Sequence, residues 1–144
     1  MSLMLFNNGN VDSFCDVVGK SYQIQIIYDG KNQTYSRNDD LFKDIIGEML
    51  SIFGEGREMP SLGVSLDNLT REEMKNGIWI QLDFEDEIVY SGMPFDSLLF
   101  KLENNSYGLS VIRKYQGLYE GRCFYFDLSE NYNQLIEVIV NRCL

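Results

Sequence analysis

Histidine is absent from the 144-residue chain. Its absence excludes the Ser–His and Cys–His pairs of nucleophilic catalysis, histidine acid–base chemistry and histidine-ligated metal sites. Carboxylates, tyrosines or lysines could still support an enzyme, but no catalytic motif built from them is present. The sequence therefore predicts a protein without catalytic residues, metal ligands or a cofactor.

Cysteine is scarce and forms no C-x-x-C pair. The three cysteines are Cys15, Cys123 and Cys143, an odd number that proposes no complete disulfide framework. Cys123 falls in a strand pattern and Cys143 on the apolar face of the last helix, so both are expected to be buried as small hydrophobic residues. This usage suits a reducing compartment.

Long apolar runs are also absent. No segment approaches the roughly 18–20 apolar residues that a membrane-spanning helix needs. The start of the chain, MSLMLF, lacks the basic segment and the long apolar core of a signal peptide. We therefore expect a cytoplasmic protein that does not enter a membrane.

Positive charge is in short supply, because 12 Lys and Arg residues stand against 22 Asp and Glu residues, for a net charge of −10. Such a chain repels nucleic acid unless its basic residues cluster, so nucleic-acid binding is not expected. The same charge would steer a basic protein partner towards it. A second interpretation needs no partner, since acidic residues also keep a protein soluble.

The chain does contain enough apolar material for a core. Hydrophobic residues make up 44% and aromatic residues 13% of its 144 residues, which suits a single domain over residues 1–144. The periodicities described next predict an α+β fold, with a twisted antiparallel β-sheet of about 5–7 strands and two main amphipathic helices packed on it.

The first half of the chain shows both periodicities. Residues 22–28 alternate as a half-buried strand, and Asp29-Gly30 is a hairpin signal before a return strand. Asn38 or Asp39 is expected to cap a helix whose apolar stripe runs over residues 41–53.

Residues 54–69, with three glycines and one proline, are predicted to be a long connection containing one short extended piece. Thr70 with Glu73 three residues later matches a capping box and predicts a short helix that ends near Gly77.

Residues 78–128 are predicted to form most of the sheet. A chain reversal is expected at Glu85-Asp86, and further strands at 97–102, 107–115 and 123–128, before a helix capped by Ser129. Alternation over 78–85 predicts two opposite faces. The core side is expected to carry Ile78, Ile80, Leu82 and Phe84, and the other side Trp79, Gln81, Asp83 and Glu85.

The densest group of candidate site residues is a set of four carboxylates within five residues. Such oxygen ligands could bind a divalent cation, although their spacing does not match a calcium-binding loop. They could instead form an acidic face for a basic partner, or be a solvated hairpin tip without function. The four residues are Asp83, Glu85, Asp86 and Glu87, with Asp96 further along.

Trp79 and Gln81 lie opposite the aliphatic row. An exposed tryptophan would suit an interface anchor. We favour the alternative, in which a helix also covers this face and Trp79 belongs to the core, because tryptophan is highly buried on average.

Basic and aromatic residues alternate near the end of the predicted sheet. Such a mixture is typical of a platform for single-stranded nucleic acid. Ordinary hairpin composition explains it as well, and we favour that interpretation because three bases are few on so acidic a chain. The residues are Arg113, Lys114 and Arg122 with Tyr115, Tyr119 and Tyr125.

The order of these elements resembles the immunity proteins of bacterial contact-dependent growth inhibition systems, above all those that neutralise nuclease toxins. The likeness covers about two thirds of the chain. Its most specific parts are the helix end Ile52-Phe53-Gly54-Glu55-Gly56 and the pattern W-x-x-x-x-F-E-D-E-x-V-Y over residues 79–90.

This resemblance implies a non-enzymatic, cytoplasmic inhibitor that binds and neutralises a basic toxin domain. The family has no fixed binding motif to carry over, so the expected contacts come from the charge and side-chain arguments above. The alternative function is a small-ligand-binding or carboxylate-based enzymatic domain, which predicts a deep pocket with converging acids or tyrosines. The expected partner contacts are Asp83, Glu85, Asp86 and Glu87, with Tyr90 and Trp79 as anchors.

Overall fold

The computed structural model of the chain describes residues 10–11, 13–60, 63–128 and 130–144. Its elements follow in chain order. They are β1 (Asn10–Val11), α2 (Phe14–Gly19), β2 (Gln23–Tyr28), β3 (Lys31–Ser36), α3 (Asp40–Glu55), β4 (Arg57–Met59), β5 (Val64–Ser65), α4 (Asp67–Glu73), β6 (Ile78–Tyr90), β7 (Met93–Leu102), β8 (Gly108–Lys114), β9 (Gly121–Arg122), β10 (Phe124–Asp127) and α5 (Asn133–Cys143).

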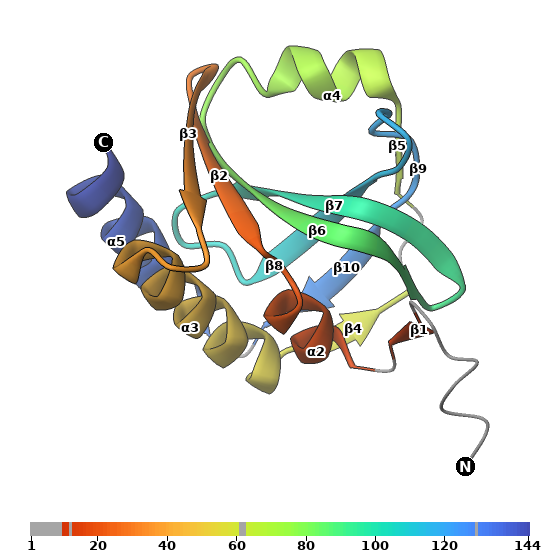
Figure 1. Cartoon of the computed structure of the whole chain (residues 1–144), viewed down its shortest axis with the longest axis horizontal. Helices are drawn as coiled ribbons and strands as arrows, with labels where there is room; N and C mark the ends of the chain where they lie inside the picture. Colours follow the sequence, from red (N-terminus) through yellow and green to blue (C-terminus); the bar gives the residue numbers. More distant parts are fainter. Residues whose placement is uncertain (1–9, 12, 61–62, 129) are drawn as a thin grey trace.

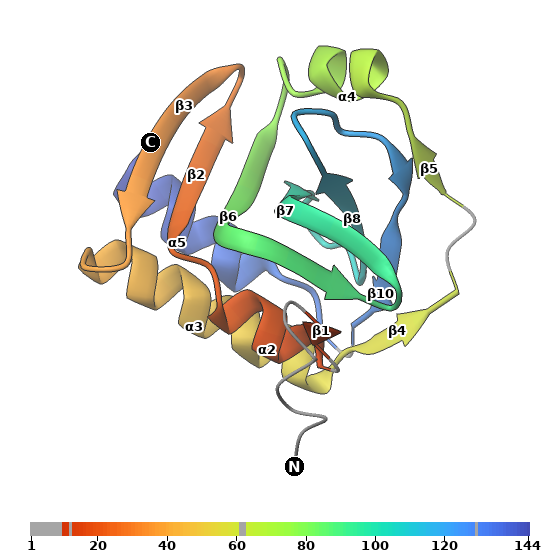
Figure 2. The same ribbon diagram turned by 45° about the vertical axis from the view of Figure 1, so that its right-hand side comes forward.

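Seven strands form one antiparallel sheet in the order β3-β2-β6-β7-β8-β10-β4, and β1 pairs in parallel with the far end of β6. Strands β5 and β9 form a separate two-stranded ribbon. The twisted sheet crosses the middle of the molecule in Figures 1 and 2, with helices on its two sides. The predicted fold class, an α+β protein with a twisted antiparallel sheet, is confirmed.

One face of the sheet packs against α2, α3 and α5, which lie on the same side in Figure 1. The predicted apolar stripe of α3 points inwards, so that Ile45 and Met49 are almost fully buried. Phe14 of α2 fits between α3 and the sheet, with its ring centroid 4.7 Å from that of Phe53 and 4.5 Å from that of Phe126. This face holds the larger of the two buried apolar clusters and is therefore the main core. Each such side chain contributes about 1.5–3 kcal/mol when it is buried.

The opposite face of the sheet carries α4, as Figure 1 shows. Beneath it, Ile27, Trp79, Leu99 and Tyr119 form a second, smaller core. Strands β2, β6 and β7 thus bury apolar side chains on both faces. The prediction that a helix covers the Trp79 side of the sheet is confirmed.

The main departure from the predicted strands concerns β6. It continues through Glu85-Asp86 as one 13-residue strand, so the predicted reversal at this dipeptide is wrong. The chain reverses at Ser91-Gly92, where φ is 50° and 75°. Positive φ at both positions matches the twist of a tight hairpin. Asn, Asp or Gly is preferred over Ser at the first position of such a hairpin turn, and the sequence analysis placed the reversal at the acidic dipeptide instead.

Helix α4 begins earlier than the capping box predicted. Its N-cap residue is Leu66, and Thr70 lies buried inside the helix, so the capping-box assignment of Thr70 and Glu73 is wrong. A residue distant in the chain stabilises the first turn of α4, since the backbone N–H of Tyr119 donates to Asp67 Oδ1 at 2.8 Å.

Other boundaries differ less. The predicted connection over 54–69 contains the expected short extended piece as β5, and also β4, which pairs with β10. Residues 97–102 form part of β7, as predicted. The N-cap residue of α5 is Tyr132, and the predicted cap Ser129 lies outside the described residues.

Candidate functional site

The four-carboxylate stretch lies in a bulge of β6. The residue pairs that flank the bulge are Asp83 with Ser97 and Ile88 with Phe95. The four residues of β6 between them face a single residue of β7, so the strand must bend locally, and bulges of this kind re-aim side chains. Phe84 turns into the core, where it is buried. The next three residues, all exposed, are Glu85, Asp86 and Glu87.

We call this exposed group, together with the residue facing it on β7, the acidic bulge: Glu85, Asp86, Glu87 and Asp96. Arg37 approaches Glu85 at 3.8 Å, but both side chains are more than half exposed, so this ion pair contributes little. Tyr115 donates its hydroxyl proton to Glu87 at 2.7 Å, and this hydrogen bond raises the pKa of Tyr115. Asp86 has no hydrogen bond or ion pair to another described residue. The acidic bulge therefore presents mostly uncompensated negative charge.

Asp83 is not part of this surface, which corrects its predicted role as a charged contact. Its side chain is buried and accepts four hydrogen bonds. Gln23 and Gln25 each donate to Oδ2 at 2.6 Å. Gln81 and Ser97 each donate to Oδ1 at 2.8 Å. A buried carboxylate needs such donors to replace water, so Asp83 joins β2, β6 and β7 just before the bulge.

The hydrogen bonds around Asp83 extend to Tyr119. The Tyr119 hydroxyl donates to Gln81 Oε1, and two cations lie over the Tyr119 ring. The Arg71 guanidinium carbon is 5.0 Å and the Lys114 ammonium 5.1 Å from the ring centroid. Burial raises the pKa of Tyr119 to about 12. Tyr119 is therefore linked through Gln81 to Asp83 in one hydrogen-bond network on the α4 side of the sheet.

Ionisation of Tyr119 is expected to destabilise the protein between pH 10 and about 12. Its pKa is near 10 when the chain is unfolded and about 12 when folded, so its contribution is complete below pH 10 and is lost as the pH rises through 12. Urea titrations should show a fall of about 2 kcal/mol in the free energy of unfolding. Tyr119→Phe should show a smaller fall, and an equal fall in both proteins would contradict this assignment.

The two predicted anchors are both buried. Trp79 is 1% exposed, and its indole N–H donates to the backbone oxygen of Asn76 at 2.7 Å. Tyr90 is buried in the main core with its ring 5.1 Å from Phe124, and its hydroxyl donates to Glu58 at 2.5 Å. The core interpretation of Trp79 is confirmed, and neither side chain is exposed as the predicted role of a partner-binding anchor requires.

The basic and aromatic cluster braces the fold. Arg113 donates to the backbone oxygens of Arg122 at 2.9 Å and Pro94 at 2.8 Å. Gly121, with φ of 110°, leaves room for it, since a Cβ there would lie 2.6 Å from the guanidinium. Because Arg113 is engaged in this way and Tyr119 is buried, these two residues are not part of an exposed platform, which agrees with the favoured interpretation of the cluster as ordinary hairpin composition.

Cys123 and Cys143 are buried, as predicted, and all three cysteines are free thiols. Burial raises the pKa of Cys123 and Cys143. Within the described ranges, no group of three or more Cys, Asp or Glu side chains has the arrangement of a metal site.

In comparisons with known proteins, no family model, no curated protein and no solved structure matches the chain. Among the described residues, no helix is both long enough and apolar enough to cross a membrane. Function is therefore inferred from the residues and their geometry.

Proposed function

We propose that this chain is a non-enzymatic, acidic protein-binding module that binds and neutralises a basic, nuclease-type toxin domain in the cytoplasm. The observation that carries the proposal is the acidic bulge. In a regular strand, Asp86 would face the opposite side from Glu85 and Glu87. In the bulge, three consecutive carboxylates are all exposed, and none of them packs into either core.

Charge supports this assignment in two ways. The net charge of −10 raises the rate at which a basic partner encounters the protein. Locally, the acidic bulge brings four carboxylates into one bend of the sheet, and the one recorded ion pair among its described residues is the weak contact of Glu85 with Arg37. A basic surface patch would therefore find its most favourable contact at this bend of β6.

The proposed contacts are the exposed acids alone. Asp83 holds the strands that carry the bulge, and Phe84 fixes its base in the core. Both residues set where Glu85, Asp86 and Glu87 project. They are positioning residues and are not expected to touch the partner.

Neutralising the bulge is expected to weaken partner binding about tenfold at low salt, since each exposed ion pair contributes about 0.2–1 kcal/mol. The variant is E85Q/D86N/E87Q. The matched control, E120Q/E130Q/E137Q, removes the same three charges from exposed positions elsewhere. Each protein is used to capture its partner from the source cells, and the affinity of the purified basic partner is then measured at low and high salt.

At high salt, the affinities of the wild-type protein and of the bulge variant for the partner should become more alike, because salt screens exposed charges. Co-expression should also protect cells from the captured toxin less well with the bulge variant than with the control. Equal weakening by the two variants would show that only net charge matters. An acidic partner, or a partner that causes no growth defect, would overturn the proposed function.

A further inference from the structure

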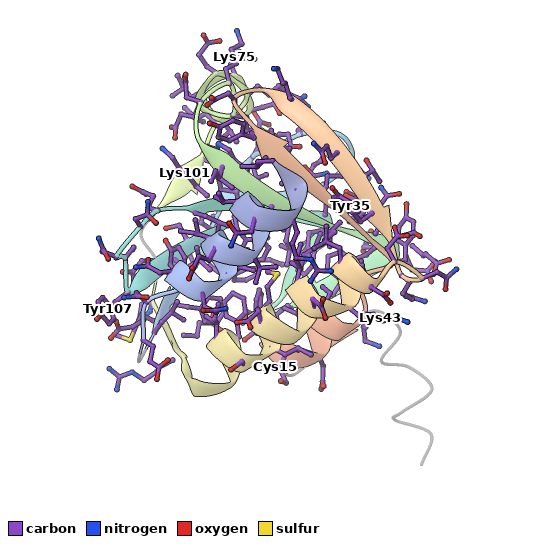
Figure 3. The ribbon with its side chains drawn as sticks, turned by 90° about the vertical axis from the view of Figure 1, so that its left-hand side faces the viewer. Cys15, Tyr35, Lys43, Lys75, Lys101 and Tyr107 are labelled. Carbon is purple, nitrogen blue, oxygen red and sulfur yellow. The ribbon has the colours of Figure 1, made fainter. Side chains whose placement is uncertain are left out.

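A second polar site lies on the α4 side of the sheet, away from the acidic bulge. It is a hollow of about 390 Å³ between the end of α4 and strands β7, β8 and β10. In Figure 3, Lys101 is labelled below α4 and above Tyr107. The residues used below, all from its lining, are Glu73, Lys101, Glu103, Ser110, Ile112 and Tyr125.

Four side chains of this hollow have unused hydrogen-bonding groups. The carboxylates of Glu73 and Glu103 and the hydroxyls of Ser110 and Tyr125 make no hydrogen bond or ion pair with another described residue. They come from four separate places in the chain, namely α4, the residue that follows β7, β8 and β10. Their convergence on one hollow gives it both acceptors and donors for a ligand.

The floor of the hollow is apolar and its shape is defined by packing. Ile112 packs against the second core. Tyr125 can cross towards β8 because position 108 is glycine, where a Cβ would lie 2.1 Å from the Tyr125 hydroxyl. An aromatic ring and an aliphatic side chain can therefore contact the stem of a ligand whose polar end reaches the rim.

The charges select a cationic ligand. Two carboxylates and one ammonium line the hollow, and the ammonium, that of Lys101, lies over the Trp79 ring at 5.6 Å from its centroid. The remainder of the chain adds to the negative potential. A phosphate would be repelled by Glu73 and Glu103. A planar guanidinium carries five N–H donors that suit carboxylate and hydroxyl acceptors.

We propose that this hollow binds an arginine side chain of a protein partner. The guanidinium hydrogen-bonds to Glu73 and Glu103, with Ser110 and Tyr125 as further acceptors. The aliphatic stem lies on Tyr125 and Ile112. This site is separate from the acidic bulge and does not depend on the proposed function.

The test is an NMR titration of the ¹⁵N-labelled protein with N-acetyl-arginine amide. Saturable shifts are expected for the amides of Lys101, Ser110 and Tyr125, and none for those of residues 85–87. The uncharged analogue N-acetyl-citrulline amide should bind more weakly. In the variant E73Q/E103Q, the dissociation constant for the arginine probe should rise about fivefold, the equivalent of two exposed ion pairs.

The control variant E120Q/E137Q removes two exposed carboxylates elsewhere and should leave the dissociation constant unchanged. Shifts spread over all acidic surfaces, or an equal loss in both variants, would overturn the proposal. So would shifts of the same amides on adding inorganic phosphate, which would assign the hollow to an anion. Because the probe needs no toxin, failure here leaves the proposed function standing, and failure of that function leaves this site standing.

Discussion

Replacing Asp83 by alanine is expected to lower the free energy of unfolding by about 3 kcal/mol. The substitution removes the acceptor of four hydrogen bonds. Gln23 and Gln25 are half-buried and can turn to water. Gln81 and Ser97 are buried, so their donors would be left without a partner, at a cost of about 1–3 kcal/mol each.

Urea unfolding followed by circular dichroism measures this effect. The matched control is Asp86→Ala, which removes the same side chain from an exposed position three residues later and should change the free energy by less than about 0.5 kcal/mol. Asp83→Asn tests whether the four donors need two acceptor oxygens, because the amide keeps one oxygen but turns an N–H group towards the donors. The free energy of unfolding of Asp83→Asn should lie between that of the wild-type protein and that of Asp83→Ala. Similar losses for Asp83→Ala and Asp86→Ala would contradict a structural role for Asp83.

The second large effect is expected for Trp79→Ala, with a loss of about 4 kcal/mol. Trp79 is the largest side chain of the second core and packs beneath α4 with Ile27 and Leu99. Its removal leaves a cavity and frees the carbonyl of Asn76 that its indole N–H satisfies. The surrounding strands are held on their other face by the main core, so they cannot collapse to fill the space.

Circular dichroism reports unfolding for this variant, since the only tryptophan is lost. The control Tyr107→Ala removes an aromatic ring that is 52% exposed and should cost about 0.5 kcal/mol or less. A loss below about 1 kcal/mol for Trp79→Ala would mean that Trp79 is not a core residue in solution. In the wild-type protein, Trp79 fluorescence should shift to the red on unfolding, as a buried indole becomes hydrated.

Sequence periodicity predicted the elements whose pattern is local. The apolar stripe over residues 41–53 repeats with the helical period and forms the buried face of α3. Asp29-Gly30 predicted its hairpin correctly. The turn needs positive φ at both central residues, and Asp and Gly adopt it readily, here with φ of 47° and 82°. The turn at Ser91-Gly92 uses the same backbone geometry without the same residue signal, and the reversal was placed too early in the chain.

The candidate site was predicted only in part. The pattern singled out the acids over residues 83–87, and three of them are exposed, but it did not separate the buried Asp83 from Glu85. Alternation shows that neighbouring residues face opposite sides of a strand. It does not show whether the second side is covered. Tyr119 and α4, which cover Gln81 and Trp79, come from other parts of the chain.

Composition and local period were therefore enough to predict an acidic, antiparallel α+β protein without histidine chemistry, since these properties depend on residue counts and near neighbours. The tertiary structure decided which acids are exposed, through the register between β6 and β7. It also decided that Trp79 is buried and that Glu73, Glu103, Ser110 and Tyr125 share one hollow. Burial and convergence depend on contacts between segments distant in the chain, which no local pattern records.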